Sequence, residues 1–346
     1  MIFTLALASL TGLSSTHDWQ TLDMELTTLA QAAPQAGNAG AGVSGWVQVS
    51  ARLQEDGVDT NADTVGDADE LGFLVDQVRL HFQGKVTPDT EYKIGVDILT
   101  STTDLQDAYI RWTLAEGQTL TAGRFLRPGF KSGMLPKLKL FFLQRTRIGA
   151  LMYRHDLGAL GGMRLGPALV QAAISNGADD QQQDLAYTLA VGTDLLGKGA
   201  GSVEGGWGAA EGTNLYGSVF AFDDGSFDDG AAFGAESHLT TQGFTVSAEL
   251  ASFGDELNYN PNPKQVGEEG STPWGVTLSY LFAERWEAAV RYEDYDDAAN
   301  RTRWTAGANH YLAGHNLKWT LQYLATDSDL PTEPEAEYAL GATLGF

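Results

Sequence analysis

The sequence predicts an all-β fold, a single antiparallel up-and-down transmembrane β-barrel of about sixteen strands. Three observations predict this class. Apolar and polar residues alternate with a period of two along most of the chain, the alternating segments are about ten residues long, and their connections alternate between short and long. The 346 residues include no Cys, which excludes a disulfide framework and a thiolate metal site. No apolar run reaches 18 residues, so a transmembrane helix is also excluded.

The segment before the barrel divides into two parts. Residues 2–13 form an apolar run of the length found in secretory signals, but no Lys or Arg precedes Arg52. We therefore expect residues 1–15 to be a signal segment, truncated if Met1 is not the true start; the alternative is a frayed tail. Residues 16–42 end in a Gly/Ala/Pro-rich stretch and are expected to be a flexible N-terminal segment and linker. The barrel then occupies residues 43–346.

Sixteen segments carry the alternation in chain order. In the first, Val47, Val49 and Ala51 share one face, and Gln48, Ser50 and Arg52 share the other. The predicted strands are 43–54, 77–83, 92–98, 107–114, 119–125, 156–165, 169–175, 185–193, 214–222, 232–240, 244–253, 274–282, 286–295, 303–312, 317–324 and 337–346. A soluble β-sandwich would also alternate, but the polar face here includes Arg, Lys, Glu, Gln and Asp, which a water-filled lumen accommodates.

The connections follow the pattern of short periplasmic turns and long extracellular loops. One stretch breaks it: residues 194–213 are Gly-rich and long where a short turn is expected. They predict either a cryptic hairpin or an excursion on the periplasmic side. The chain ends on an alternating strand that closes with Phe346, which resembles the insertion signal of bacterial outer-membrane barrels. Tyr92, Trp286 and Trp319 follow short turns on the apolar face, where interfacial aromatic girdles are expected.

The net charge is −24, which argues against a nucleic-acid partner that is bound by phosphate neutralisation. The acidic residues crowd the long loops, notably 55–71, 177–184, 223–231 and 325–336. We expect these loops to be solvated and to bridge through divalent cations to lipopolysaccharide. The runs lack an EF-hand pattern, so no metal site and no cofactor is predicted.

One window reverses the sign of the charge. Residues 117–155 contain eight Lys or Arg and no Asp or Glu. They cover one predicted strand and the longest loop, the third extracellular one, which in this architecture is expected to fold into the lumen and narrow it. Basic side chains at a narrow pore attract anions and repel cations. The predicted constriction residues are Arg124, Arg127, Lys131, Lys137, Lys139, Arg145 and Arg147, and further lumen-facing candidates are Arg52, Arg79, Lys93, Asp97, Arg111, Arg291 and Lys318.

These cations have an alternative role: they could pair with acidic residues and simply hold the loop. Lumen-side Asp97, Asp107, Glu249, Glu287 and Glu293 are available as partners and would weaken anion selectivity.

Several motifs, in this order, resemble a known family, the phosphate-selective porin O and P family of Gram-negative outer membranes. They are DAYIRW (107–112), TAGRF (121–125), RPGF (127–130), QRT (144–146), HDLG (155–158), ISNG (174–177), AAVRYE (288–293), GANHYL (307–312) and GHNLK (314–318). The resemblance covers roughly residues 43–346. It implies a sixteen-stranded homotrimeric channel of the bacterial outer membrane, assembled by the barrel-assembly machinery, with outer-membrane lipid and small anionic solutes as its other partners.

The family's phosphate channels use a ladder of arginines, a lysine cluster and a constriction with arginine and an acidic group. By the resemblance, Arg124, Arg127 and Lys131 correspond to the start of the constricting loop and Arg145 to the basic residue after it. The acidic residue often found just before that position is Gln144 here. Asp97 is an acidic partner by strand phase only, and only Arg52 and Arg79 qualify for the ladder.

The leading hypothesis is a passive porin that prefers small anions, phosphate among them. Two alternatives remain for the barrel itself, a general or cation-tolerant porin and a closed structural or adhesive barrel. An enzyme is not predicted, because no nucleophile motif such as G-x-S-x-G accompanies the histidines.

Overall fold

A computed structural model describes residues 41–55, 70–98, 103–177, 184–226, 230–254, 270–297, 300–329 and 336–346. The predicted signal segment (1–15), almost all of the predicted linker (16–42) and most of the acidic loops lie outside the described residues. Within the described part, no helix combines the length and the apolar character needed to cross a membrane.

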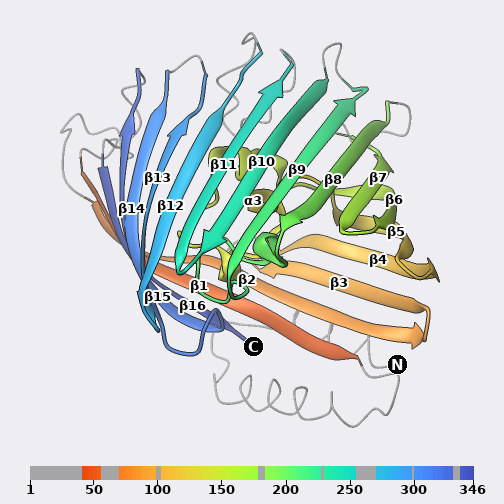
Figure 1. Cartoon of the computed structure of the whole chain (residues 1–346), viewed down its shortest axis with the longest axis horizontal. Coiled ribbons are helices and arrows are strands. Elements are labelled where there is room, and N and C mark those ends of the chain that lie inside the picture. Colours follow the sequence, from red (N-terminus) through yellow and green to blue (C-terminus); the bar gives the residue numbers. More distant parts are fainter. Residues whose placement is uncertain are drawn as a thin grey trace, which may run out of the picture.

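Sixteen antiparallel strands form one closed barrel in which each strand pairs with its neighbours in sequence and β1 pairs with β16 (Figure 1). The strands are β1 (Gly42–Glu55), β2 (Glu70–Thr87), β3 (Thr90–Ile98), β4 (Thr103–Ala115), β5 (Gln118–Leu126), β6 (His155–Leu165), β7 (Ala168–Ser175), β8 (Ala186–Leu196), β9 (Thr213–Asp224), β10 (Ala231–Thr241), β11 (Phe244–Phe253), β12 (Trp274–Ala283), β13 (Trp286–Asp294), β14 (Thr302–Tyr311), β15 (Leu317–Asp327) and β16 (Ala336–Gly345). The predicted fold class and strand number are confirmed.

The barrel is closed in register. Val49 of β1 lies opposite Ala342 of β16 on one side and Val75 of β2 on the other. At the end of the seam, Gly45 and Phe346 exchange two main-chain hydrogen bonds of 3.0 Å each. A closed sheet has no free edge, so each strand's main-chain groups are paired within the protein, as a hydrocarbon environment requires.

The alternation sorts apolar side chains to the outside and polar ones to the inside. On β15, Trp319 and Leu321 are exposed, whereas Lys318 and Thr320, which alternate with them, are buried. This is the reverse of a soluble sandwich, whose apolar face would be covered.

The connections are short at one end of the barrel, where β2–β3, β4–β5, β6–β7, β10–β11 and β12–β13 turn through two residues. Residues 197–212, between β8 and β9, are the long exception at this end. They contain one short helix, η3 (Ala200–Ser202), and no strand, so the predicted cryptic hairpin is wrong. From the opposite end, the connection between β5 and β6 contains α3 (Lys131–Met134), η2 (Lys137–Lys139) and α4 (Arg147–Met152).

Candidate pore constriction

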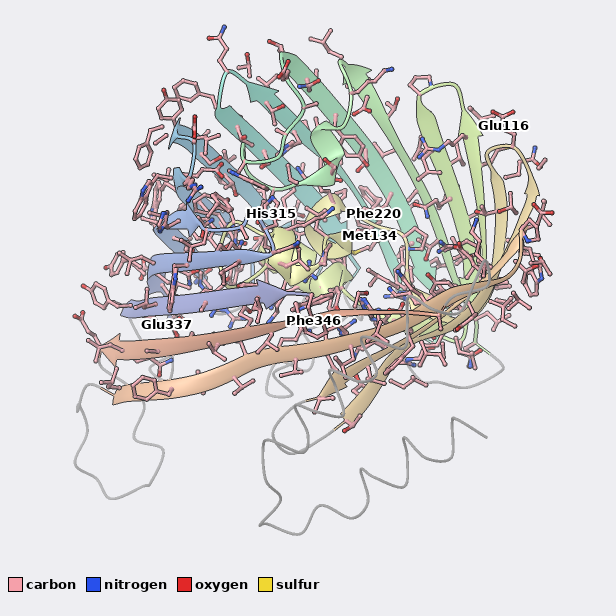
Figure 2. All side chains as sticks on the ribbon, turned by 90° about the horizontal axis from the view of Figure 1, so that it is seen from below. Glu116, Met134, Phe220, His315, Glu337 and Phe346 are labelled. Atoms are coloured by element: carbon pink, nitrogen blue, oxygen red, sulfur yellow. The ribbon has the colours of Figure 1, made fainter. Side chains whose placement is uncertain are left out.

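The connection between β5 and β6, called here the 127–154 segment, lies inside the ring of strands, with its helices at the centre of the view in Figure 2. It is anchored to inward carboxylates of the wall opposite β1–β5. The main-chain N–H of Lys131 donates to Glu236 of β10 at 2.8 Å, and Ser132 Oγ donates to Glu249 of β11 at 2.6 Å. Further along, the N–H of Arg147 donates to Glu293 of β13 at 2.5 Å.

An apolar cluster fixes the same segment against β8–β11. Phe130, Ile148 and Met152 pack with Phe220 and Phe222 of β9 and with small inward residues of the neighbouring strands. The rings of Phe130 and Phe220 meet edge to face at 4.7 Å. The wall makes room because its inward positions here are small: a Cβ at Gly234 would lie 2.8 Å from the Phe130 ring. The 127–154 segment therefore packs against a complementary apolar surface of the wall.

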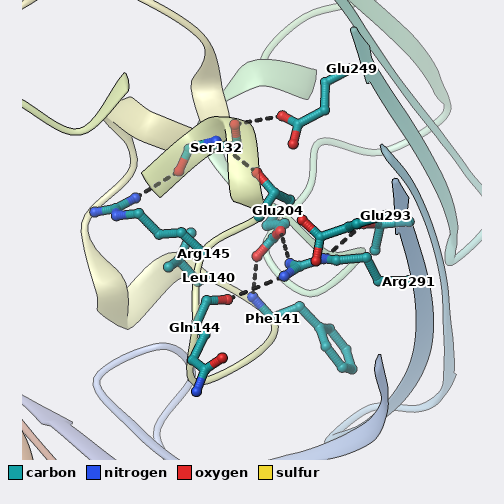
Figure 3. A network of polar contacts seen from close by, with 12 residues as sticks. Ser132, Leu140, Phe141, Gln144, Arg145, Glu204, Glu249, Arg291 and Glu293 are labelled. Carbon is teal, nitrogen blue, oxygen red and sulfur yellow. Dashed lines mark hydrogen bonds and ion pairs between the residues drawn. The ribbon is translucent and has the colours of Figure 1, made fainter. Parts of the chain in front are cut away.

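A second element enters the barrel from the short-turn end. In the connection between β8 and β9, the 197–212 segment, Glu204 is 5% exposed and Arg291 of β13 is 1% exposed. Glu204 accepts from the guanidinium of Arg291 at 2.6 Å and from the main-chain N–H of Phe141 at 2.6 Å (Figure 3). One carboxylate thus joins both interior segments to the wall.

Residues of β13, of β14 and of the connection after β14 also hold the 197–212 segment. Glu287 of β13 accepts from the N–H groups of Gly206 and Trp207, the latter at 3.3 Å. The Trp207 ring stacks on Tyr311 at 5.1 Å, and His315 lies 3.1 Å from the Trp207 carbonyl oxygen. The interior next to β13–β15 is therefore filled by this segment and by the 127–154 segment.

Most of the predicted lumen-facing cations on strands have carboxylate partners. Arg79 bonds Asp97 through two nitrogens at 2.8 and 2.6 Å. The remaining pairs are Lys93 with Asp107 at 2.9 Å, Arg111 with Glu91 at 3.0 Å, Arg52 with Asp76 and, at 3.5 Å, with Glu337, and Arg291 with Glu204. The alternative in which cations pair with acidic residues therefore describes this group.

A second group holds the interior segments through carbonyl oxygens. Lys318 of β15 donates to Leu140, Lys131 donates to Ala200 at 3.2 Å, and Arg145 donates to Ser132 at 2.7 Å. Burial lowers the pKa of Lys131, and the nearby carboxylates of Glu236, Glu204 and Glu249 act in the opposite direction.

Five of the predicted constriction residues have no carboxylate oxygen within 4 Å of their side-chain nitrogens among the described residues: Arg124, Lys137, Lys139, Arg145 and Arg147. Burial lowers the pKa of Lys137, an effect opposed by the charge of Asp76. Arg145 lies over the Tyr153 ring at 4.1 Å and Arg147 over Tyr295 at 5.2 Å. The uncompensated positive charge thus belongs mainly to the 127–154 segment.

Two of the predicted constriction residues, Arg124 and Arg127, make contacts of other kinds. Arg124 shares the strand phase of Leu120 and Ala122, opposite to that of buried Thr121, and its Nε donates to Leu105 O of β4 at 2.8 Å. It is therefore held against the sheet. Arg127 is buried, with its guanidinium 4.2 Å from the centre of the Phe222 ring.

A cavity of about 320 Å³ lies between the β1–β4 wall and the 127–154 segment. The wall contributes Arg79, His81 and Lys93, and the segment contributes Leu138 and Tyr153. Because the segment is anchored to the opposite wall, this side is the candidate passage through the barrel.

Sequence reasoning missed Glu204 and the segment that carries it. The Gly-rich composition of residues 194–213 marked an exception, but alternation assigns a face only to residues in strands. The position of Glu204 between two glycine-rich stretches was the one signal available.

Comparisons with known proteins agree with this architecture. Residues 47–202 match the family model described as phosphate-selective porin O and P, which confirms the resemblance drawn from the motifs over this part of the chain. No curated protein sequence matches the chain.

Among solved structures, an anion-selective porin from Comamonas acidovorans is 12% identical, with a TM-score of 0.57 over 89% of this chain and 100% of that chain. A loop L8 deletion variant of OmpT, an outer membrane protein of Vibrio cholerae, is 11% identical, with a TM-score of 0.57 over 89% and 99%. OmpF of Salmonella typhi in complex with daunomycin is 13% identical, with a TM-score of 0.56 over 89% and 98%. At these identities the likeness shows the fold. The family match over residues 47–202 and the barrel fold support a location in the bacterial outer membrane.

Proposed function

We propose that this chain, whose residues 47–202 match the phosphate-selective porin O and P family, is a passive diffusion channel that prefers small anions. Solutes follow their gradient, and the side chains of the 127–154 segment and the facing wall select among them by size and charge. No catalytic group or cofactor takes part.

The observation that carries the anion preference is the uncompensated charge of Lys137, Lys139 and Arg145. None of these three has a carboxylate oxygen within 4 Å of its side-chain nitrogens among the described residues, and Lys137 is partly exposed. Cations that are not neutralised in a narrow pore raise the local anion concentration, because low-dielectric walls focus the field.

The pairing of the wall arginines with carboxylates argues for a broad anion preference over a dedicated phosphate path. Recognition of phosphate by arginine uses two parallel N–H groups of one guanidinium. In Arg79 two nitrogens already bond Asp97, and Arg52 is shared between Asp76 and Glu337. Phosphate is therefore proposed as one permeant anion among several.

The test is the reversal potential of single channels in planar bilayers under a KCl gradient. The wild-type protein should favour chloride, and Lys137→Glu should lower the chloride-to-potassium permeability ratio by roughly tenfold or more. Arg164→Glu is the matched control, since Arg164 is exposed beside the β6–β7 turn and loses the same charge. Cation preference in the wild-type protein would leave a general porin and defeat the anion proposal.

A closed structural barrel is the second candidate, and the 197–212 segment favours it, because two segments occupy the interior next to β13–β15. Liposome swelling with small sugars distinguishes the two candidates: an open channel admits them, whereas a closed barrel does not.

The membrane partners are carried over from the family resemblance as proposals. A homotrimer should migrate as one species in unheated gels, and Phe346 is proposed as the signal read by the assembly machinery. The exposed Phe346 ring at the barrel end supports that role.

A further inference from the structure

Tyr153 lies at a point where the 127–154 segment meets the wall of β1–β4. It directly follows α4, near the end of the segment, and it is partly exposed. Nη2 of Arg79 on β2 donates to the Tyr153 hydroxyl oxygen at 2.5 Å. This hydrogen bond joins the wall to the segment on the side of the barrel that holds the candidate passage. While it is intact, no solute fits between the two atoms.

The wall holds Arg79 in the orientation that this bond needs. Nε and Nη2 of Arg79 bond the two oxygens of Asp97 at 2.8 and 2.6 Å, which leaves the second N–H of Nη2 for Tyr153. Behind this ion pair, Gln77 donates to Asp97 at 2.7 Å, and Trp46 donates to Gln77 at 2.9 Å. Side chains from three strands therefore fix the donor that faces the Tyr153 hydroxyl.

The Tyr153 ring is held from its other side. The guanidinium of Arg145 lies over the ring at 4.1 Å, and the His155 ring meets it edge to face at 5.3 Å. Arg145 is itself bonded within the segment, to Ser132 O at 2.7 Å. If the hydroxyl leaves Arg79, these contacts keep the ring with the segment, and a gap opens between the segment and the wall.

The cavity of about 320 Å³ ends at this bond on the side of β1 and β2. Its lining residues on these strands stop at Trp46 and Arg79, which lie opposite each other in the register. Toward the short-turn end the lining includes Asn316 and Phe346, which are exposed. The bond therefore lies between this cavity and the long-loop end of the barrel.

We propose that Tyr153 sets the width of the passage. Bonded to Arg79, its hydroxyl closes the route between the two ends of the barrel, and its release opens that route. Tyr153 is a positioning residue, because it sets the distance between segment and wall and leaves the charges of the lumen unchanged. The inference rests on the proposed function, since it names the residue that limits solute size in that channel.

The first test compares single channels of the wild-type protein and of Tyr153→Phe in symmetric KCl. Phe keeps the ring beside Arg145 but cannot accept from Arg79. The ratio of open to closed dwell times should rise at least about tenfold, the factor expected for one hydrogen bond to a charged group. Larger sugars should also enter in liposome swelling. Tyr216→Phe is the matched control, because Tyr216 is also partly exposed but does not line the cavity.

A double-mutant cycle assigns the effect to the pair. Arg79→Lys keeps the positive charge, but one ammonium cannot reproduce the fork that bonds Asp97 and Tyr153 together. Each single variant should raise the ratio of open to closed dwell times, and the double variant should raise it no further than the larger single effect. Effects that multiply would mean that the two side chains act independently, and the bond would be rejected as the cause.

A second measurement locates Tyr153 in the passage. The chain has no Cys, so Tyr153→Cys introduces a unique thiol that an anionic methanethiosulfonate reagent can label. Labelling should reduce the single-channel current at least about twofold, because the added group fills the narrow point. The same label on Arg164→Cys, beside the β6–β7 turn, should leave the current unchanged. An unchanged current after labelling of Tyr153→Cys would place this residue outside the passage and overturn the inference.

The outcomes separate this inference from the proposed function. A dwell-time ratio that Tyr153→Phe leaves unchanged would overturn the inference, even if the urea midpoint falls, because a merely structural role moves only the midpoint. A silent wild-type barrel that Tyr153→Phe makes conductive would support the inference, and one that stays silent would overturn it. Cation preference in the reversal-potential experiment would reject the anion proposal alone, since the dwell-time ratio does not depend on which ion carries the current.

Discussion

Replacing Glu204 with Gln should release the two interior segments from each other and from the wall. Glu204 accepts from Arg291 and from the Phe141 N–H at 2.6 Å each. The substitution keeps the size of the side chain and removes its charge. Gln has one carbonyl oxygen, which can accept from Arg291 or from the Phe141 N–H but no longer offers a separate oxygen to each. Arg291 is then a buried cation without a carboxylate partner, and its other acceptors are Thr277 and the Gln144 carbonyl oxygen, both at 3.2 Å.

The expected loss of free energy follows from the burial of Glu204 and Arg291. Both partners are nearly inaccessible to water, and the loss of one member of such a pair costs about 3–5 kcal/mol, because the other charge stays buried and uncompensated. If that cost falls on the docked arrangement of the segments, the ratio of docked to released states drops by roughly two to nearly four orders of magnitude.

Two assays read this out. Single-channel recordings should show a larger and noisier conductance, since released segments no longer occupy the lumen beside β13–β15. Urea unfolding in lipid vesicles should show a lower midpoint. Glu211→Gln is the matched control, because Glu211 lies exposed in the same segment and makes the same chemical change.

A double variant tests the cause. Glu204→Gln combined with Arg291→Met removes the buried charge along with its partner, and much of the lost stability should return. If Glu204→Gln and Glu211→Gln behave alike in both assays, the pair does not hold the segments. If stability falls while conductance stays constant, the 197–212 segment does not limit the current.

Three further predictions concern the short-turn end of the barrel. Gly314 has φ +62°, and a Cβ there would lie 2.1 Å from the Trp207 ring; Gly314→Ala should therefore lower the urea midpoint more than Gly166→Ala, which has the same φ and no atom within 4 Å. Burial lowers the pKa of His315 from 6.5 to about 4. The unfolded chain therefore binds more protons between these values, and about 3 kcal/mol of stability present above pH 6.5 should be lost as the pH falls to 4. His315→Gln should flatten that dependence of the urea midpoint on pH, and an unchanged slope would contradict the assignment. Deletion of Phe346 removes two hydrogen bonds to Gly45, so the folded fraction in membranes should fall while Phe346→Tyr retains it; equal assembly by the deletion variant would reject the insertion role.

Much of the fold could be predicted because a two-residue period is a local property. Residues 317–324 predict a strand with Trp319 outside and Lys318 inside, and that is how β15 lies. The candidate site was less predictable. Arg79 and Arg145 are both basic and were grouped together, yet Arg79 bonds Asp97 and Arg145 bonds a main-chain oxygen. The residue that each arginine bonds depends on which strands meet and on how the interior segments cross the barrel.

The amino-acid sequence by itself determined the strand count, the faces of each strand and the concentration of positive charge in residues 117–155, because each follows from composition and from alternation between neighbouring residues. Only the tertiary structure decided which of those charges are neutralised. Glu204 reaches Arg291, 87 positions away, because the 197–212 segment turns inward instead of closing as a short turn. Closure of the sheet confines both interior segments to one small volume, and the burial of each charge follows from that confinement.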